Sequence, residues 1–583
     1  MLRKMYLLLC LLLAGNAAAQ QLNFVWAKGM GAPNAMGNAG ATGINMCHDV
    51  LGNVYLAGTF QDTVDFDPGP GTFFMSSTTM YDVFILKLDQ SGNFQWAKRL
   101  TGGDNEGPTS IAMDNAGNLL LFGEFKASMD FDPDSAASFV LTSYGASDAY
   151  LVKLSASGAF IWARQFGGSD ADRGNTMVID DTGHILIGGL FKGTADFDPS
   201  AATSLLNSNG GNDAYLAKIS PTGNLVWVKS YGGPYWDEIH SICVSPSGHI
   251  YAAGSFIDNV DFDPGAGIFS ISTPNTTTAT VIWHISSSGN FTWARPVLAS
   301  SPNGHITPTG IHYHNTGVLF VSGYFDQSAD FNPDVNADSV LSSVAGSQDL
   351  FLLKLDDAGL FRWVRSIGNN NIDASSCVIS DAAGHCYFKG SFGGTLDIDP
   401  HPVNSSTISS GGGPGSRSEY LAVLDPSGNF TWGAKTEGFS VGYRGNIIDL
   451  DQHRFYHAGQ FGGTVDFDPA SSVFNLSSAP ATGTAFLVQL NRSSTGLDGP
   501  SAAASFCSLV PNPASDLFQV RSSRSLNKAS IHLLDASGKV VLRETNLNGT
   551  VFNLDVQGLS PGTYLVEIMD ASGREAHKLL IER

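Results

Sequence analysis

The chain has 583 residues, of which 14% are charged and 43% are hydrophobic, and it contains 66 glycines. Disordered chains are rich in charge and poor in apolar residues, so this composition excludes a largely disordered protein. Lys and Arg together number 31 and Asp and Glu 53, which gives a formal net charge of −22. A chain this acidic is not expected to bind the phosphate backbone of a nucleic acid.

The first 19 residues are typical of a secretory signal peptide. Arg3 and Lys4 precede an apolar run from Met5 to Ala14, and three alanines at positions 17–19 follow. We therefore expect residues 1–19 to be removed during export. The run is too short to span a bilayer and no later segment is long and apolar enough, so we expect no transmembrane segment.

Five cysteines remain after the signal peptide, an odd number that does not indicate a disulfide framework. Cys377 and Cys386 flank a predicted hairpin turn, but they would not lie directly opposite each other. Buried free thiols are the favoured interpretation, and a disulfide between these two residues is the alternative.

Three sequence markers recur seven times at intervals of 65–70 residues, which indicates seven structural repeats. An aspartate-rich tetrad, D-x-D-P or once D-F-N-P, begins at Asp65, Asp130, Asp196, Asp261, Asp330, Asp397 and Asp466. Tryptophan recurs at Trp26, Trp96, Trp162, Trp227, Trp293, Trp363 and Trp432. A G-x-F triplet ends at Phe60, Phe125, Phe191, Phe256, Phe325, Phe392 and Phe461.

Each repeat is predicted to contain four short strands joined by glycine-containing turns. In the second repeat these strands are near Ser110–Met113, Leu119–Phe125, Ala149–Leu154 and Phe160–Arg164. Runs such as DVFILKL are apolar on both faces, as strands between neighbouring sheets require. The expected fold of residues 20–495 is therefore all-β, a seven-bladed β-propeller.

The two ends of the repeat array complement each other. The last repeat stops after its third strand, Phe486–Leu490, whereas the mature N-terminus begins with a lone tryptophan strand, Gln21–Lys28. We expect the N-terminal strand to complete the last blade, because this pairing closes the ring and removes two open sheet edges.

A change of composition separates the C-terminal region from the repeats. Residues 496–505 form a Gly/Ser/Ala-containing linker, and residues 506–583 carry equal numbers of acids and bases. This tail alternates predicted strands, including Ile531–Leu534 and Thr563–Met569, with turns of sequence DASG. We expect a small β-sandwich.

The tail resembles a known family. The segment Leu509–Asp516, LVPNPASD, is similar to the opening of the C-terminal sorting domain of the type IX (Por) secretion system, and Leu559–Tyr564 and Lys578–Ile581 match its later motifs. The resemblance implies a Bacteroidota-type bacterium and Sec export to the periplasm. It also implies recognition of residues 506–583 by the type IX machinery, removal of the domain, and a secreted or outer-surface product that is often anchored to lipopolysaccharide.

The repeats in turn resemble the secreted bacterial beta-propeller repeat family (SBBP-like). That resemblance covers residues 20–490 and implies little about activity, because propellers carry many functions.

The tetrads have two interpretations. Asp followed by Pro suits a turn in which the carboxylate accepts backbone hydrogen bonds, and this is the favoured interpretation. The alternative is Ca²⁺, which prefers carboxylate and carbonyl oxygens. Its candidate ligands are Asp65, Asp67, Asp130, Asp132, Asp196, Asp198, Asp261, Asp263, Asp397, Asp399, Asp466 and Asp468.

Other candidate sites are less regular. The segment from Tyr231 to Glu238 contains Tyr235, Trp236 and Asp237, aromatic and acidic residues that suit a glycan or peptide ligand, although ordinary loop packing is favoured. His312 and His314, with His305 nearby, have metal-like spacing but lack a fitting third ligand.

A third-strand pattern concerns aspartates that each precede a lysine by five residues: Asp82, Asp148, Asp213 and Asp349, with Lys87, Lys153, Lys218 and Lys354. An odd offset places the two side chains on opposite faces of a strand. We therefore expect a structural salt link between adjacent blades more than a catalytic pair.

These observations favour a secreted or cell-surface binding or adhesion protein without catalytic residues, whose partner would be a glycan or a surface protein. The alternative is a secreted Ca²⁺-dependent enzyme that degrades polysaccharides or peptides. An enzyme should place acid and base residues in only one or two blades, whereas the repeats are uniform. The sequence motifs identify no cofactor beyond the calcium hypothesis.

Overall fold

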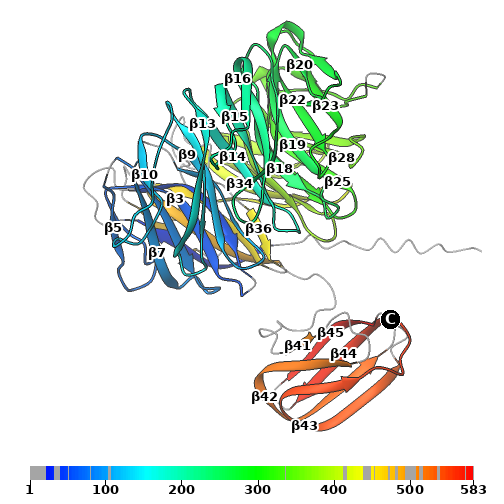
Figure 1. Ribbon diagram of the computed structural model, residues 1–583. Coiled ribbons are helices and arrows are strands. Elements are labelled where there is room, and N and C mark those ends of the chain that lie inside the picture. The colour runs from blue at the N-terminus through cyan, green and yellow to red at the C-terminus, as the bar shows by residue number, and fades with distance from the viewer. Residues whose placement is uncertain are drawn as a thin grey trace, which may run out of the picture. The chain divides into compact units, whose positions relative to one another are not determined.

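A computed structural model describes residues 22–31, 40–49, 51–78, 80–102, 107–334, 337–410, 417–436, 448–451, 454–469, 473–478, 484–492, 507–510, 517–534, 539–570 and 573–581. The predicted signal peptide and linker lie outside these residues. The described chain is all-β: strands form almost all of its regular structure, with two 3₁₀ turns, η1 (Pro274–Thr276) and η2 (Val344–Gly346). The chain divides into two compact units, Met1–Ser493 and Ser494–Arg583 (Figure 1). None of the described segments forms a helix with the length and apolar character needed to cross a membrane.

The first unit consists of seven four-stranded antiparallel groups, which we call repeats 1 to 7, counted over the described residues. Repeat 1 contains β2 (Gly40–His48), β3 (Val54–Gln61), β6 (Asp82–Leu88) and β7 (Phe94–Gly102), and repeat 2 contains β8 (Pro108–Met113), β9 (Leu119–Phe125), β12 (Asp148–Leu154) and β13 (Phe160–Gly168). Repeat 3 contains β14 (Arg173–Ile179), β15 (Ile185–Asp196), β16 (Leu205–Ile219) and β17 (Leu225–Tyr231), and repeat 4 contains β18 (Glu238–Val244), β19 (Ile250–Ile257), β22 (Thr278–Ile285) and β23 (Phe291–Ala299). Repeat 5 contains β24 (Ile306–His314), β25 (Val318–Phe325), β28 (Asp349–Asp356) and β29 (Phe361–Ile367), and repeat 6 contains β30 (Ala374–Ser380), β31 (Cys386–Gly393), β34 (Arg417–Leu424) and β35 (Phe430–Thr436). Repeat 7 contains β36 (Ile448–Asp451), β37 (Arg454–Phe461), β40 (Thr484–Arg492) and, from the N-terminus, β1 (Leu22–Met30).

Short hairpins leave the repeats between the second and third strands, where the tetrads lie. They pair β4 (Thr63–Asp65) with β5 (Phe74–Ser76), β10 (Ser128–Asp130) with β11 (Val140–Thr142), β20 (Asn259–Asp261) with β21 (Ser270–Ser272), β26 (Ser328–Asp330) with β27 (Val340–Ser342), β32 (Thr395–Asp397) with β33 (Thr407–Ser409), and β38 (Thr464–Asp466) with β39 (Asn475–Ser477). In repeat 3 the same hairpin is part of the longer strands β15 and β16. The four strands predicted for repeat 2 are confirmed, with small extensions at their ends.

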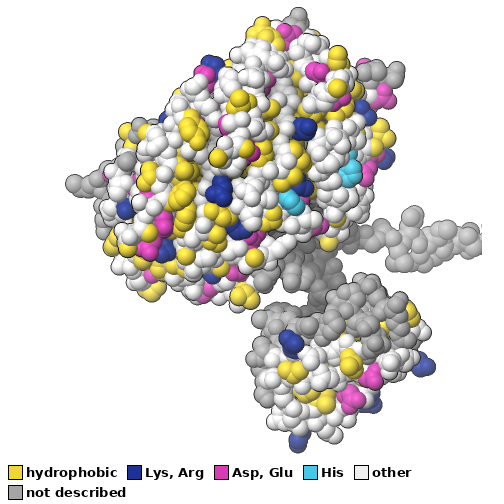
Figure 2. All heavy atoms as spheres, in the orientation of Figure 1, with side chains coloured by type: hydrophobic (Ala, Val, Ile, Leu, Met, Phe, Trp, Pro, Cys, Tyr) yellow, Lys and Arg dark blue, Asp and Glu magenta, His cyan; other side chains and the backbone are white. Residues whose placement is uncertain are grey.

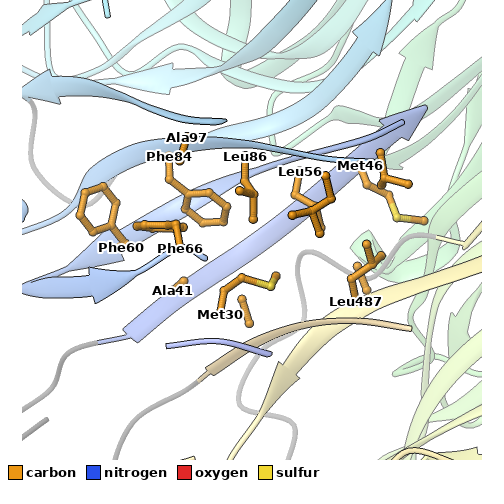
Figure 3. Packing of buried hydrophobic residues seen from close by; sticks show 14 of the residues in the cluster. Met30, Ala41, Met46, Leu56, Phe60, Phe66, Phe84, Leu86, Ala97 and Leu487 are labelled. Atoms are coloured by element: carbon orange, nitrogen blue, oxygen red, sulfur yellow. The ribbon is translucent and has the colours of Figure 1, made fainter. Parts of the chain in front are cut away.

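The N-terminal strand completes repeat 7, as predicted. β1 pairs antiparallel with β40, from Leu22 opposite Arg492 to Met30 opposite Ala485. Met30 is fully buried in an apolar cluster that joins this repeat to repeat 1 and also contains Ala41 and Leu487 (Figure 3). The first strands of successive repeats contact one another, and β2 also contacts β36 and β37, so the contacts return to the start of the series.

In six of the seven repeats, counted over the described residues, the recurring tryptophan packs against a turn of the next repeat. Trp162 of repeat 2 lies against Gly223, in the turn between the third and fourth strands of repeat 3, where an added Cβ would be 3.3 Å from the indole. Arg164 binds the same turn, because its Nε donates a hydrogen bond to the Gly223 carbonyl at 3.0 Å. Gly223 has a φ of +83°, a conformation that favours glycine. The same contact joins Trp26 to Gly92, Trp96 to Gly158, Trp227 to Gly289, Trp293 to Gly359 and Trp363 to Gly428.

The second unit is a small sheet with its own core. Its strands are β41 (Cys507–Val510), β42 (Leu517–Leu534), β43 (Val540–Asp555), β44 (Gly562–Asp570) and β45 (Gly573–Ile581). β42 pairs with β41, β43 and β44, and β45 pairs with β44. Phe518, Ile531, Val566 and Leu579 belong to its buried cluster, so this unit has the apolar interior that independent packing requires.

Candidate functional site

The loop between β17 and β18 carries the aromatic candidates at the protein surface. The exposed fraction is 66% for Trp236 and 44% for Tyr235, whereas it is 0% for Asp237. The sequence placed all three residues in one ligand-binding group. The structure instead separates them, because the aromatic rings face solvent and the carboxylate lies beneath the loop.

The buried carboxylate of Asp237 holds this loop in place by accepting two backbone hydrogen bonds. Its Oδ2 accepts a hydrogen bond from the N–H of Gly233 at 2.7 Å, and its Oδ1 accepts one from the N–H of Ile257 on β19 at 3.0 Å. The N–H of Asp237 donates to the carbonyl of Asn212 on β16 at 2.8 Å. One buried carboxylate therefore joins repeat 3 to repeat 4 and anchors the loop that presents the two aromatic residues.

A second buried carboxylate, Asp213 at 1% exposure, belongs to the same junction. Its Oδ2 accepts from the N–H of Asn209 at 3.1 Å, while its Oδ1 is buried without a hydrogen-bond partner. Gly232 packs directly on it, since a Cβ at Gly232 would lie 2.1 Å from Asp213 Cγ. Burial, helped by the nearby charge of Asp237, raises the pKa of Asp213 to about 7. Burial likewise raises the pKa of Asp237 to about 7 against two backbone hydrogen bonds that lower it.

The same carboxyl pair recurs with a separation of 24 residues at two other junctions: Asp148 with Asp172, and Asp349 with Asp373. A Cβ at Gly167 would lie 2.8 Å from both Asp148 Cγ and Asp172 Oδ2, so these two carboxyls face each other across a glycine. Burial raises the pKa of Asp172 and Asp373 to about 7 and that of Asp349 to about 6. The sequence analysis identified Asp148, Asp213 and Asp349 in one pattern and Asp237 in another, but it did not relate them by the spacing of 24, and it missed Asp172 and Asp373.

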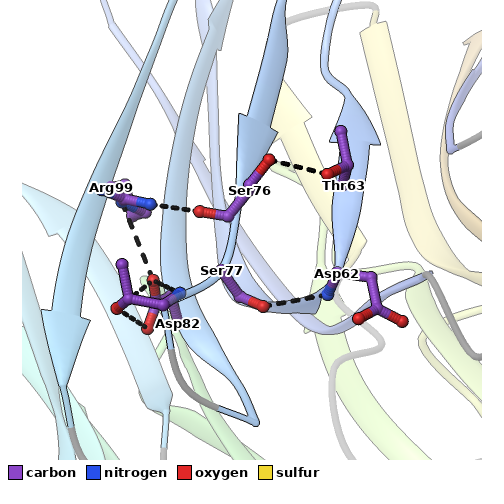
Figure 4. Close-up of polar contacts among 7 residues, drawn as sticks. Asp62, Thr63, Ser76, Ser77, Asp82 and Arg99 are labelled. Atoms are coloured by element: carbon purple, nitrogen blue, oxygen red, sulfur yellow. Dashed lines mark hydrogen bonds and ion pairs between the residues drawn. The ribbon is translucent and has the colours of Figure 1, made fainter.

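Two junctions show what replaces the pair. In repeat 4, Ala279 takes the strand position of Asp213, and Ile306 takes the position of Asp237 at the start of β24, so both acids are absent. In repeat 1, Asp82 keeps the first acid but pairs with Arg99 at 3.7 Å (Figure 4). Arg99 also donates to the Ser76 carbonyl. The strand position of Arg99 is occupied by Ser230 in repeat 3.

The tetrads form the turns that the sequence favoured. Asp65 Oδ1 accepts from the N–H groups of Asp67 at 3.1 Å and Phe73 at 2.8 Å. The same two bonds, at 3.0–3.1 Å and 2.8 Å, are made by Asp130, Asp196, Asp261, Asp330, Asp397 and Asp466. The intervening Phe66 is fully buried, 5.2 Å from the ring of Phe60. Within the described ranges, no three His, Cys, Asp or Glu residues are grouped so that they could hold a metal ion. The calcium interpretation therefore stays a prediction.

The strand lysines do not form the salt link expected from the sequence. Lys153 Nζ pairs with Asp114 Oδ2 at 2.7 Å, in a turn of its own repeat, and donates to the Pro221 carbonyl of the next repeat at 3.1 Å. Lys218 pairs in the same way with Asp180 at 2.8 Å. The lysines thus do connect repeats, but through a backbone carbonyl, because the turn carboxylate lies closer to the ammonium group than any acid of the neighbouring repeat.

The other sequence candidates separate in the structure. His305 pairs with Asp326 at 3.3 Å, and His314 Nδ1 lies 2.7 Å from Thr316 Oγ1. Burial lowers the pKa of His312 to about 4. Cys377 and Cys386 are free thiols, as favoured from the sequence, since Cys377 lies opposite Lys389 and Cys386 opposite Ser380.

One charged group at the junction of repeats 6 and 7 was missed by the sequence analysis. Lys389 Nζ lies 2.7 Å from Glu419 Oε2 and donates to the Ala458 carbonyl at 3.1 Å, and His457 Nε2 lies 3.3 Å from the same carboxylate oxygen. All three side chains are buried. Despite its burial, the pKa of Glu419 is lowered to about 2 because Lys389 and His457 stabilise its charge. A lysine within the apolar strand CYFKGSF was the available signal.

Comparison with curated proteins finds relatives that are similar to part of the chain. The chain is 24% identical over 217 residues to an uncharacterized WD repeat-containing protein of Acanthamoeba polyphaga mimivirus, a match that covers 33% of this chain and 16% of that protein. It is 24% identical over 219 residues to an endo-acting ulvan lyase of Formosa agariphila, covering 37% of this chain and 41% of the lyase. The chain therefore spans less than half the length of these relatives.

A solved structure of a Synechocystis apocarotenoid oxygenase mutant is similar over 80% of this chain and 96% of that chain, with 12% identity and a TM-score of 0.36. Residues 508–582 match the family described as the secretion system C-terminal sorting domain. This match supports the sequence resemblance noted for the tail. The C-terminal unit thus carries a Por-type sorting domain, which indicates secretion through the type IX system to the cell surface or the medium.

Proposed function

We propose that this chain is a non-enzymatic binding or adhesion protein, displayed outside a Bacteroidota-type cell, whose repeat unit is a seven-bladed β-propeller of the SBBP-like type. The cyclic contacts among the seven four-stranded repeats and the pairing of β1 with β40 support this fold. In this proposal residues 1–19 are the signal peptide, 20–495 the propeller, 496–505 the linker, and 506–583 a small β-sandwich that the type IX machinery recognises.

The observation that carries the proposal is the solvent-exposed aromatic pair Tyr235–Trp236 on a loop anchored by a buried carboxylate. Large exposed aromatic side chains are enriched at binding sites because they bury much area while few rotatable bonds are fixed. Their faces suit the C–H groups of a sugar ring or the side chains of a surface protein. A loop already held in place loses little conformational entropy on binding, which favours affinity.

The test is a glycan and protein array probed with the full-length secreted protein and with the Trp236→Ala and Tyr235→Ala variants. We expect specific capture by the wild type and a loss of roughly tenfold or more for Trp236→Ala, the usual size of a binding hot spot. Leu51→Ala is the matched control, since Leu51 is an apolar residue with 74% exposure in a different loop. Undiminished capture by both aromatic variants would contradict the proposal.

The second candidate function is a Ca²⁺-dependent enzyme that degrades polysaccharides or peptides. It is favoured by the partial similarity to the ulvan lyase and by the twelve aspartates of the tetrads named above. Incubation of the full-length protein with ulvan and with other acidic polysaccharides, in Ca²⁺ and in EDTA, tests it. Chain shortening that requires Ca²⁺ would support this function, and intact polymer in both conditions would exclude it for those substrates.

A further inference from the structure

We propose that pH regulates the surface loop that carries Tyr235 and Trp236 through the buried carboxyl pair Asp213–Asp237. The loop is held in place while the pair retains a proton, and it loosens when both carboxyls are ionised. The inference rests on the proposed function, because it concerns the regulation of the same binding loop.

Asp213 and Asp237 support two neighbouring segments. Asp213 holds the segment before the core of β16 through Asn209, and Asp237 holds the following loop through Gly233. These two segments touch each other, since a Cβ at Gly211 would lie 1.9 Å from the carbonyl oxygen of Tyr235. The carboxyl pair is therefore the shared support of two segments that pack together beneath Tyr235 and Trp236.

The charge of the carboxyl pair is not balanced by a nearby ion pair in the described chain. Neither Asp213 nor Asp237 forms an ion pair with a lysine or an arginine of the described chain. The titratable groups near the pair on the packed elements are Tyr231 at the end of β17, Glu238 and His240 on β18, and Asp258 after β19. The lysines of these strands are engaged elsewhere, because Lys218 pairs with Asp180 and Lys229 lies against Gly289. Tyr231 donates to the Glu238 carbonyl at 3.1 Å, and His240 Nε2 pairs with Glu238 Oε1 at 3.3 Å. No cation thus offsets the repulsion that two ionised, buried carboxylates would create.

The raised pKa values determine how the stability of the loop changes with pH. In the unfolded chain both carboxyls lose their protons near pH 4, whereas in the folded protein burial raises the pKa of each to about 7. The folded loop therefore binds more protons than the unfolded chain between about pH 4 and 7. The stability of the loop falls as the pH rises through this range, and the full penalty is present above about pH 7.

The other junctions provide an internal comparison. Of the other pairs, Asp349 with Asp373 lies near Arg417, whose charge lowers the pKa of Asp373, and Asp148 accepts a hydrogen bond from Gln165. Among the described junctions, the loop between repeats 3 and 4 alone exposes a tryptophan.

In repeat 1 the first acid, Asp82, pairs with Arg99 at 3.7 Å. Ser230 occupies in repeat 3 the strand position that Arg99 occupies in repeat 1. The substitution Ser230→Arg should therefore give Asp213 an arginine partner like that of Asp82.

The experiment is hydrogen–deuterium exchange of the peptide containing Gly233 in the full-length protein without any ligand, from pH 5.5 to 8.5, corrected for the intrinsic pH dependence of amide exchange. We expect the protection of this peptide to fall by roughly tenfold or more per pH unit between pH 5.5 and about 7 and to level off above pH 7. The loss should become smaller in Asp213→Asn, in which only Asp237 remains to titrate, and in Ser230→Arg, which places a positive charge beside the pair. Asp338→Asn removes an exposed acid elsewhere and should retain the wild-type pH dependence.

Protection that does not change with pH in the wild type would overturn the inference. A fall in Asp213→Asn and Ser230→Arg that is as large as in the wild type would also overturn it. The use of two variants keeps the test decisive if Asp213→Asn fails to fold. Because no ligand is present, the result is independent of whether Tyr235 and Trp236 bind one. A failure of the array experiment would therefore refute the proposed function without affecting this measurement.

Discussion

Repeats 3 and 7 have the same strand order but are assembled from different parts of the chain. Repeat 3 uses four consecutive strands, β14 to β17, whereas repeat 7 takes its fourth strand from the N-terminus. The tryptophan of each fourth strand nevertheless lies at the same strand position, with Trp227 opposite Lys218 and Trp26 opposite Gln489. Strand pairing and side-chain packing therefore define a repeat, and an unbroken chain is not required.

The largest expected loss of stability comes from removing β1, the N-terminal strand that completes repeat 7. A protein that begins at residue 31 should unfold at a much lower temperature than one that begins at residue 20, because Leu22, Ala27 and Met30 lose their buried positions. Burial of each large apolar side chain contributes about 1.5–3 kcal/mol, and the exposed edge of β40 promotes association. Thermal melts and size-exclusion chromatography of the two proteins measure both effects. Equal melting temperatures would show that β1 does not stabilise repeat 7.

A smaller effect is expected from the buried charge beside this repeat. Lys389→Met should lower the free energy of unfolding by about 3–5 kcal/mol, because Glu419 would remain buried without its ammonium partner. Lys153→Met is the matched variant within a contiguous pair of repeats, and it should cost less because Asp114 also accepts hydrogen bonds from Asn118. Urea denaturation measures both values. A larger loss for Lys153→Met would contradict the expectation that Glu419 depends more on its lysine than Asp114 does.

The smallest effects concern the turns that repeats 1 and 7 share. Asp65→Ala removes two backbone hydrogen bonds and should cost about 1–3 kcal/mol, whereas Asp67→Ala removes one bond, to the exposed Gly69, and should cost about 1 kcal/mol. Asp466→Ala in repeat 7 should match Asp65→Ala, since Asp466 makes the same two bonds. Thermal melts in urea-free buffer can rank the three variants, and a larger loss for Asp67→Ala would refute the turn interpretation.

The same melts decide the calcium hypothesis. If the tetrads only form turns, wild-type melting temperatures in Ca²⁺ and Mg²⁺ at matched ionic strength should be equal. A specific Ca²⁺ site would instead stabilise the folded state by about 2.7 kcal/mol at a hundredfold excess over its Kd. A melting temperature that rises with Ca²⁺ but not with Mg²⁺ would restore the metal interpretation.

Much of the architecture was predictable because it repeats. The strands of repeat 2, the tetrad turns and the pairing of β1 with the last repeat follow from periodicity and turn chemistry. The site was harder to predict. Asp237 stands beside Tyr235 and Trp236 in the sequence, yet its carboxylate is buried while they are exposed, because it accepts hydrogen bonds from Gly233 and Ile257. Its true neighbour, Asp213, lies 24 residues away across a strand and a loop, and one sequence gives no direct measure of such contacts.

The pairing of Leu22 with Arg492 also affects the order of events during folding. These residues are 470 positions apart, so closing this contact costs about 4 kcal/mol more chain entropy than closing a hairpin of about six residues. Repeats 1 to 6 can form from local contacts as soon as their own strands are available. Repeat 7 must wait until the end of the array has been made, and during this time β1 remains without its partner strand. The last contact to form should also be the first to open. The time during which β40 lacks β1 on its outer edge therefore sets how long this edge is exposed to proteases and to association with other chains.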